Sequence, residues 1–176
     1  MPQTILQVME ELPQRVKSVY DSAFRLADEE IKLRVIDSSV ILLAIIKLGD
    51  TNSSARWLHS TGLTDATVLS FIMEDFMVRK EQKRVRDRWG DKRPIPVIIT
   101  ATESTIKTLS YLGTVRQDCR ATGEVYIAHV LEAIAYSDSS TVQRIFGSVG
   151  LEMADVRNAL NIPSIQDLET LFSRRN

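Results

Sequence analysis

Cysteine, glycine, proline and long apolar runs are all scarce in this chain of 176 residues. The single cysteine, Cys119, excludes an internal disulfide and a cage of thiolate metal ligands. Seven glycines and five prolines are too few for a loop-rich β fold. No apolar stretch approaches the length of a membrane-spanning helix, and the N-terminus lacks the basic-then-apolar pattern of a signal peptide. We therefore expect a soluble, cytoplasmic protein that is rich in helix.

The net charge is close to zero, because 22 Lys and Arg residues are balanced by 23 Asp and Glu residues. Such a chain is not a uniformly basic coat for nucleic acid, although it can carry a local basic patch. Apolar residues make up 44% of the sequence and charged residues 26%, which is typical of a globular domain. The length suits a single domain over residues 1–176.

Apolar residues recur at helical spacing in the first half of the chain. They predict a helix from Val16 to Ile31, and the run Val40 to Leu48 is apolar nearly all round. Periodicity alone does not distinguish a buried strand from a buried helix in such a run. Its flanks, Asp37-Ser38-Ser39 and Gly49-Asp50, are typical of helix caps and favour a central buried helix.

Further cap signals divide the rest of the chain into short helices. Ser53 or Ser54 is predicted to cap a helix that ends at Gly62, and Thr64 to cap the next one. In the second half, Thr100 and Glu103 have the spacing of a capping box, which predicts a helix from that point. More helices are predicted over 126–135, from the Ser/Asp/Thr cluster at 137–141 to Gly150, and over 151–160.

The two halves of the sequence resemble each other. Gly62-Leu63 recurs 88 residues later as Gly150-Leu151, and Leu42 recurs 89 residues later as Leu131. Further pairs at these two offsets are Arg56 with Arg144, Ala66 with Ala154, Val68 with Val156, Ala44 with Ala133, and Ile45 with Ile134. Repeats of this kind predict two tandem units of about four helices each. We place them at 14–78 and 100–160, joined by a basic linker over 79–99 and followed by a C-terminal helix over 161–176.

These units resemble the Clp N-terminal domain of Hsp100-type AAA+ chaperones and proteases. Each repeat of that family is centred on a pattern close to I-x-x-E-H-L-L-L-A-L-L, and a helix ending in Gly-Val or Gly-Leu follows. Ile36 to Ile46 is similar to this centre in the first half, and Val125 to Ile134 in the second. The Glu-His pair of the family is replaced by Ser39-Val40 and by Ala128-His129.

The resemblance implies an all-α module that is not an enzyme and needs no cofactor. Members of the family dock on or precede an AAA+ motor, and they bind client proteins or an adaptor. The motor itself is absent, because G-x-x-x-x-G-K-[ST] does not occur in the sequence. The chain is then either a free-standing accessory protein or the front piece of a longer chaperone.

A basic strip over residues 79–93 carries eight basic and three acidic side chains, a net charge of +5 in a chain of net charge −1. It is either a docking strip for phosphates or an acidic partner, or a solvated linker between the halves. The candidates for partner binding within it are Arg79, Lys83, Arg84, Arg86, Arg88 and Trp89. Leu168 and Phe172, on the terminal helix, are candidates for an apolar face that a partner covers.

Other residues with reactive side chains favour structural roles. His129 fits a hydrogen-bonded core histidine and His59 a solvated one, since no further ligands stand at metal-binding spacing. The adjacent carboxylates Glu29-Glu30 and Glu74-Asp75 point about 100° apart on a helix, so we expect solvated faces and no catalytic pair. The alternative to the Clp-like function is a helical protein that binds nucleic acid or an acidic partner through the basic strip.

Overall fold

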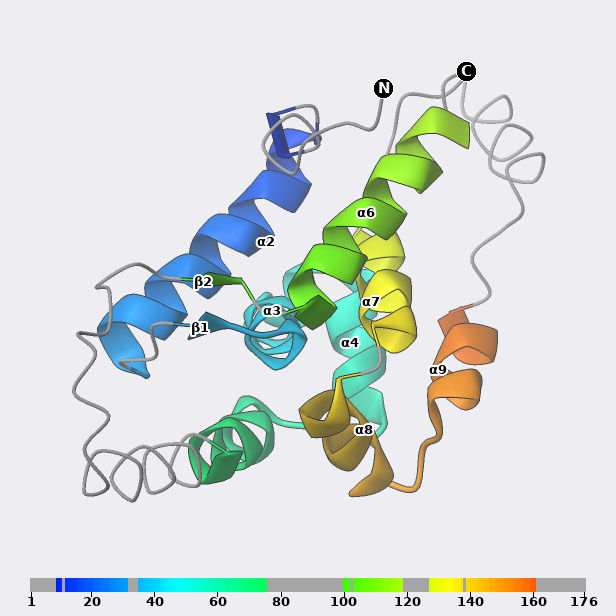
Figure 1. Cartoon of the computed structure of the whole chain (residues 1–176). Coiled ribbons are helices and arrows are strands. Elements are labelled where there is room, and N and C mark those ends of the chain that lie inside the picture. Colours follow the sequence, from blue (N-terminus) through cyan, green and yellow to red (C-terminus); the bar gives the residue numbers. More distant parts are fainter. Residues whose placement is uncertain are drawn as a thin grey trace, which may run out of the picture.

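The computed structural model describes residues 9–10, 12–31, 35–75, 100–101, 103–118, 127–137 and 139–160. This part of the chain is mostly helical, which confirms the all-α class (Figure 1). Among its helices, none combines the length and the apolar character that crossing a bilayer requires.

Between residues 12 and 75, the described part of the first half contains three labelled helices, two short irregular turns of helix, one very short strand and one further helix. In chain order these are α2 (Gln14–Arg25), a π-helical turn (Leu26–Glu30), β1 (Val35–Ile36), α3 (Ser38–Ile46), a 3-10 turn (Gly49–Thr51), α4 (Ser53–Ser60) and a helix over residues 65–75. The helix predicted from Val16 to Ile31 is therefore regular only to Arg25 and continues as the π-helical turn.

In the described residues of the second half, four helices follow a very short strand. In chain order these are β2 (Thr100–Ala101), α6 (Glu103–Asp118), α7 (Ile127–Tyr136), α8 (Ser140–Gly147) and α9 (Met153–Leu160). β1 and β2 pair in parallel, with Val35 opposite Thr100 and Ile36 opposite Ala101. The capping box predicted at Thr100 is therefore wrong, because Thr100 pairs with β1 and α6 begins at Glu103.

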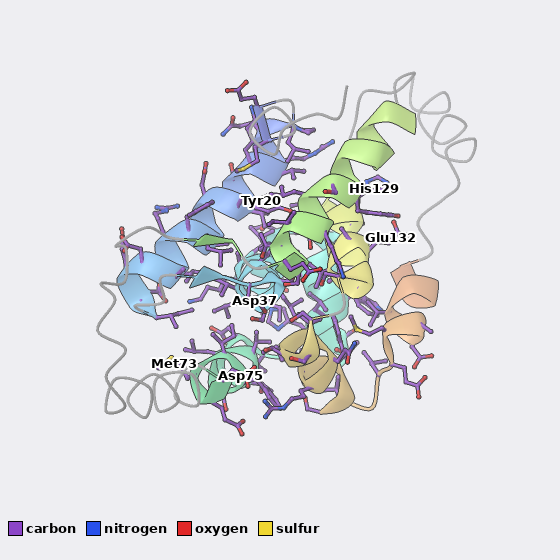
Figure 2. All side chains as sticks on the ribbon, viewed as in Figure 1. Tyr20, Asp37, Met73, Asp75, His129 and Glu132 are labelled. Atoms are coloured by element: carbon purple, nitrogen blue, oxygen red, sulfur yellow. The ribbon has the colours of Figure 1, made fainter. Side chains whose placement is uncertain are left out.

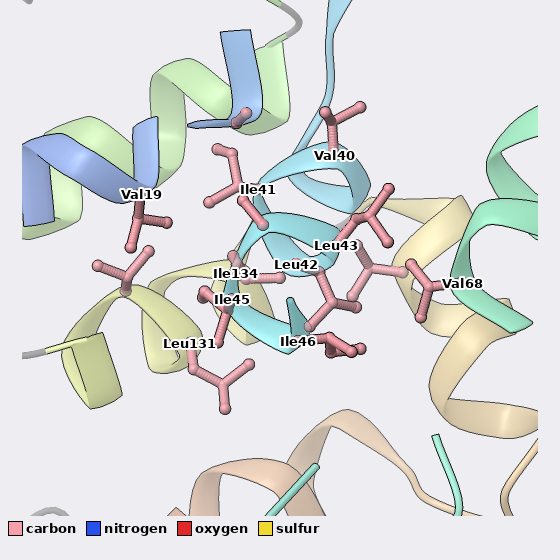
Figure 3. Packing of buried hydrophobic residues seen from close by; sticks show 14 of the residues in the cluster. Val19, Val40, Ile41, Leu42, Leu43, Ile45, Ile46, Val68, Leu131 and Ile134 are labelled. Atoms are coloured by element: carbon pink, nitrogen blue, oxygen red, sulfur yellow. The ribbon is translucent and has the colours of Figure 1, made fainter. Parts of the chain in front are cut away.

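Helix α3 lies at the centre of the fold, where α2, α4, α6, α7 and α8 all contact it. All nine of its residues are buried, as expected for a helix that is apolar on every side. Figure 3 shows its side chains meeting Val19 of α2, Val68 of the 65–75 helix, and Leu131 of α7. Each fully buried Val, Leu or Ile contributes about 1.5–3 kcal/mol, so this helix is the main apolar support of the fold.

The helix caps explain where several helices begin and end. Asp37 caps α3 and Thr64 caps the 65–75 helix, as predicted. The cap of α4 is Asn52, whose Oδ1 accepts from the backbone N–H groups of Ser54 and Ala55, so the prediction of Ser53 or Ser54 is wrong by one or two residues. The end of α3 is also earlier than predicted, at Ile46 with Lys47 as the C-cap, and Gly49 with φ of 59° begins the 3-10 turn.

Candidate functional site

A polar cluster surrounds Asp37 at the start of α3, near the middle of the molecule (Figure 2). The Oδ2 atom of Asp37 accepts the backbone N–H of Ser39 at 3.1 Å and the hydroxyl of Ser39 at 2.8 Å. This is an N-cap, in which a side-chain oxygen satisfies a backbone donor that has no partner within the helix. The sequence analysis predicted this cap at the start of α3.

The same carboxylate also accepts hydrogen bonds from two distant segments. The hydroxyl of Ser104, in the first turn of α6, donates to Oδ1 at 2.9 Å. The hydroxyl of Ser139 donates to Oδ2 at 3.1 Å, and Ser139 is itself the N-cap of α8, whose oxygen accepts from the N–H of Val142 at 3.3 Å. The starts of α3, α6 and α8 therefore meet at one carboxylate.

Further buried hydroxyls extend the cluster. Ser38 donates to the hydroxyl of Ser104 at 3.0 Å. Thr105 donates to the carbonyl of Ile36 at 2.8 Å, and Thr108 donates to the carbonyl of Ser104 at 2.9 Å. Buried hydroxyls are costly unless they are hydrogen-bonded, so these contacts fix the relative positions of β1, α3 and α6.

The environment of Asp37 favours its ionised form. Burial on its own raises the pKa of a carboxyl group, but the hydrogen bonds from Ser39, Ser104 and Ser139 outweigh it, so the pKa lies below the ordinary value. A carboxylate with a lowered pKa is a weak base. The arrangement therefore suits holding three helices together better than removing a proton from a serine.

A second polar cluster joins the 65–75 helix to α8. The guanidinium of Arg144 donates to Asp75 Oδ1 at 2.7 Å and to Glu74 Oε2 at 2.9 Å, and it lies 5.3 Å from the ring centre of Phe71. Thr141 donates a further hydrogen bond to Asp75. Glu74 is exposed, as predicted for a solvated face, whereas Asp75 is only partly exposed. One flexible guanidinium reaches both side chains although they leave the helix in different directions.

The two histidines have structural contacts. His129 is buried on α7 with 3% of its surface exposed, as predicted, and burial together with the charge of Arg15 lowers its pKa. His59 is exposed, yet its Nε2 lies 3.2 Å from the carbonyl oxygen of Ile46, so it links the ends of α4 and α3 and is not merely solvated. In the part of the chain that the structure describes, no three His, Cys, Asp or Glu side chains are grouped so as to hold a metal ion.

Three large apolar side chains of the described residues are exposed: Phe24, Met73 and Ile106, each by 36–38% (Figure 2 labels Met73). They belong to α2, the 65–75 helix and α6. Single exposed apolar residues are common on protein surfaces, so none of the three marks an interface by itself.

The residues that the sequence singled out for partner binding all lie outside the described residues. They are Arg79, Lys83, Arg84, Arg86, Arg88 and Trp89 of the basic strip, and Leu168 and Phe172 of the predicted C-terminal helix. Cys119 and the linker over 79–99 lie outside them as well.

The sequence analysis missed the cluster around Asp37. Its signal was present as hydroxyl residues near three predicted helix starts, at 38–39, 104–105 and 139–141. Each group is explained equally well as a local cap, and local spacing does not show that three caps share one carboxylate.

Comparison with known proteins gives a structural likeness alone. No protein-family model matches the chain, and no curated protein matches it. Among solved structures, one from "Preliminary structural investigations of a malarial protein secretion system" is similar, with a TM-score of 0.54 and 18% sequence identity. The match covers 85% of this chain and 92% of that chain. At this identity the two share a fold, and the likeness says nothing further about this chain.

Proposed function

We propose that this chain is a non-enzymatic protein-interaction module similar to the Clp N-terminal domain, built from two related four-helix halves. It binds client proteins, an adaptor, or an AAA+ unfoldase with its protease, and serves protein quality control in the cytoplasm. The proposal begins from the sequence resemblance, and the arrangement of the described helices supports it in two ways.

The observation that carries the proposal is the agreement in burial between most of the residues that the two halves pair; Leu63 with Leu151 is an exception, since Leu63 is buried and Leu151 only partly so. The apolar pairs Leu42 with Leu131, Ala44 with Ala133, Ile45 with Ile134, and Val68 with Val156 are buried in both halves. The pairs Ala66 with Ala154 and Arg56 with Arg144 are exposed in both halves. Every residue of α3 is buried, so the pairs on that helix do not depend on the alignment. The other pairs do, because a shift by one residue would set buried Val68 against exposed Asp155, or exposed Arg56 against buried Ile145.

The two halves also agree in the order of their helices, and each has a glycine after its third helix. Each half runs through a first helix, a mostly buried second helix, a third helix of eight residues and a fourth helix. A glycine with positive φ follows the third helix in both halves. Gly62, with φ of 93°, lies two residues after the end of α4 at Ser60, and Gly150, with φ of 74°, lies three residues after the end of α8 at Gly147. Glycine adopts this conformation without strain, so both halves have a glycine where the chain turns after the third helix.

The second candidate function is binding of nucleic acid or of an acidic partner through the basic strip over 79–93. The sequence favours it through the net charge of +5 in that strip. The two functions differ in how they depend on salt. Binding that rests on phosphate contacts weakens steeply with added salt, whereas burial of apolar surface does not.

Fluorescence anisotropy with two labelled probes tests the proposal. The first probe is a permanently unfolded, reduced and carboxymethylated polypeptide, and the second is a single-stranded oligonucleotide. We expect the full chain to bind the polypeptide with a Kd that changes by less than about threefold between ~50 mM and ~200 mM salt. Tight oligonucleotide binding that weakens by a factor of about ten or more over that range, without polypeptide binding, would reverse the choice.

A further inference from the structure

We propose that Asp37 is a latch of this fold, whose carboxylate fastens the starts of α6 and α8 to the start of α3. Removing its charge frees those two helix starts and leaves the apolar core around α3 in place. The inference concerns the mechanics of the fold and does not depend on the proposed function.

The contacts of Asp37 join segments that are far apart in the sequence. Asp37 is bonded to Ser39 within its own helix, to Ser104 at a sequence separation of 67, and to Ser139 at a separation of 102. Its two oxygen atoms thus serve one local cap and two long-range bridges. Hydrogen bonds to a charged acceptor are about twice as strong as neutral ones, so these bridges are favoured while the carboxylate is ionised.

The dipoles of three helices also favour a negative charge at Asp37. A helix N-terminus carries about half a positive charge, and it attracts an anion within its first turn. Here α3, α6 and α8 all begin beside the same carboxylate, so one negative charge is opposed to three positive helix ends. Without that charge, the three ends repel each other and two of them lose an acceptor.

The packing of the apolar core around α3 does not depend on the hydrogen bonds of Asp37. All nine residues of α3 are buried, and its contacts with α2, α4 and α7 are independent of the cluster. Loss of Asp37 should therefore open the starts of α6 and α8 locally before the molecule unfolds as a whole.

Two charged side chains on the adjoining helices pair with other residues, namely Lys107 on α6 and Arg144 on α8. The helix α3, from Ser38 to Ile46, contains no charged residue. On α6, Lys107 pairs with Glu103 at 3.7 Å, and on α8, Arg144 pairs with Glu74 and Asp75. The hydroxyl groups thus set the state of Asp37. Because its pKa is below the ordinary value, the latch is closed at neutral pH and opens only in acid.

The test is native-state hydrogen exchange of Asp37→Asn. Asparagine is among the best N-cap residues, so the cap of α3 remains, but its single oxygen cannot serve both bridges. We expect amide protection to fall on the order of tenfold over residues 107–110 of α6 and 143–146 of α8. Protection over residues 57–60 of α4 should stay within about twofold.

Asn52→Asp is the matched control, since it makes the reverse exchange at the local cap of α4, and it should leave α6 and α8 unchanged. If Asp37→Asn does not fold, Ser104→Ala removes the bridge to α6 together with the bond from Ser38, and it leaves the bridge from Ser139 in place. It should lower protection in α6 but not in α8. Acidification of the wild type until Asp37 is protonated should reproduce the Asp37→Asn pattern, and the variant should lack that response. Equal loss of protection in every helix, or no loss in α6 and α8, would overturn the latch.

Discussion

At the scale of single residues, His129 links the stability of the fold to pH. Its imidazole is buried on α7, and burial first, then the charge of Arg15, lowers its pKa below the ordinary value of about 6.5. In the unfolded chain the imidazole takes up a proton near pH 6.5, whereas in the folded protein it does so only at lower pH. Acidification therefore favours the unfolded state.

We expect the free energy of unfolding to be at its full value above about pH 6.5 and to fall as the pH drops through the folded pKa of His129. Urea unfolding followed by circular dichroism between pH 7.5 and pH 5 measures this slope. His129→Gln, which keeps a polar side chain but does not titrate, should flatten it. His59→Gln, at the exposed histidine, should keep the wild-type slope, because His129 is still present. Equal slopes in wild type and His129→Gln would contradict the assignment.

The roles of single residues were predictable where they depend on neighbours in sequence. The cap formed by Asp37 and the burial of His129 follow from spacing and apolar context. The bond from Ser139 to Asp37 and the contact of His59 with Ile46 join separate helices. Side chains that meet only after the helices pack leave no mark in local spacing, so sequence analysis did not find them.

At the scale of the elements, Arg144 joins α8 to the 65–75 helix through two carboxylates of unequal exposure. The side chain of Asp75 is 24% exposed and also accepts from Thr141, whereas that of Glu74 is 61% exposed. Exposed ion pairs are screened by water and contribute little, so Asp75 should be the stronger partner.

Double-mutant cycles of Arg144→Met with Asp75→Asn and with Glu74→Gln measure the two couplings. We expect about 1 kcal/mol for Asp75 and less than about 0.5 kcal/mol for Glu74, each decreasing as salt is added. A larger coupling to Glu74 than to Asp75 would mean that burial does not govern this cluster.

The buried second helices of the two halves allow a test of the paired alignment. Ala44 on α3 and Ala133 on α7 are 3% and 1% exposed. Ala44→Asp and Ala133→Asp should each destabilise the protein by about 3–5 kcal/mol, because each buries an unpaired charge. Ala66→Asp and Ala154→Asp are the matched controls at a paired, exposed position near a helix start, and they should change stability by no more than about 0.5 kcal/mol. A melting temperature close to that of the wild type for either Ala44→Asp or Ala133→Asp would contradict the paired alignment.

The helices were predictable from apolar spacing, but their ends were less so. The run around α3 was identified because it is apolar all round and has a capping aspartate. The cap of α4 and the start of α6 were misplaced because several Ser, Thr and Asn residues compete for each position. The sequence analysis assigned Thr100 to a capping box. In the structure Thr100 belongs to β2, because it pairs with Val35 of β1, 65 residues earlier in the chain.

At the scale of the whole molecule, α3 is surrounded by helices from both halves, and Asp37 ties the starts of two second-half helices to it. The all-α class and the central position of α3 follow from the sequence through apolar patterning. A partner surface does not follow in this way, because exposed residues are under no packing constraint. The residues predicted for it also lie outside the described part of the chain.

The central claim is that the chain binds other proteins and not nucleic acid. Affinity capture from lysate of the source organism tests it most directly, with the wild type and the triple variant Arg84→Ala, Arg86→Ala, Arg88→Ala at low and moderate salt. We expect both proteins to retain an AAA+ unfoldase, its protease, an adaptor or client polypeptides at both salt concentrations. Retention of nucleic acid by the wild type alone, lost as salt rises, would contradict the claim and assign the function to the basic strip.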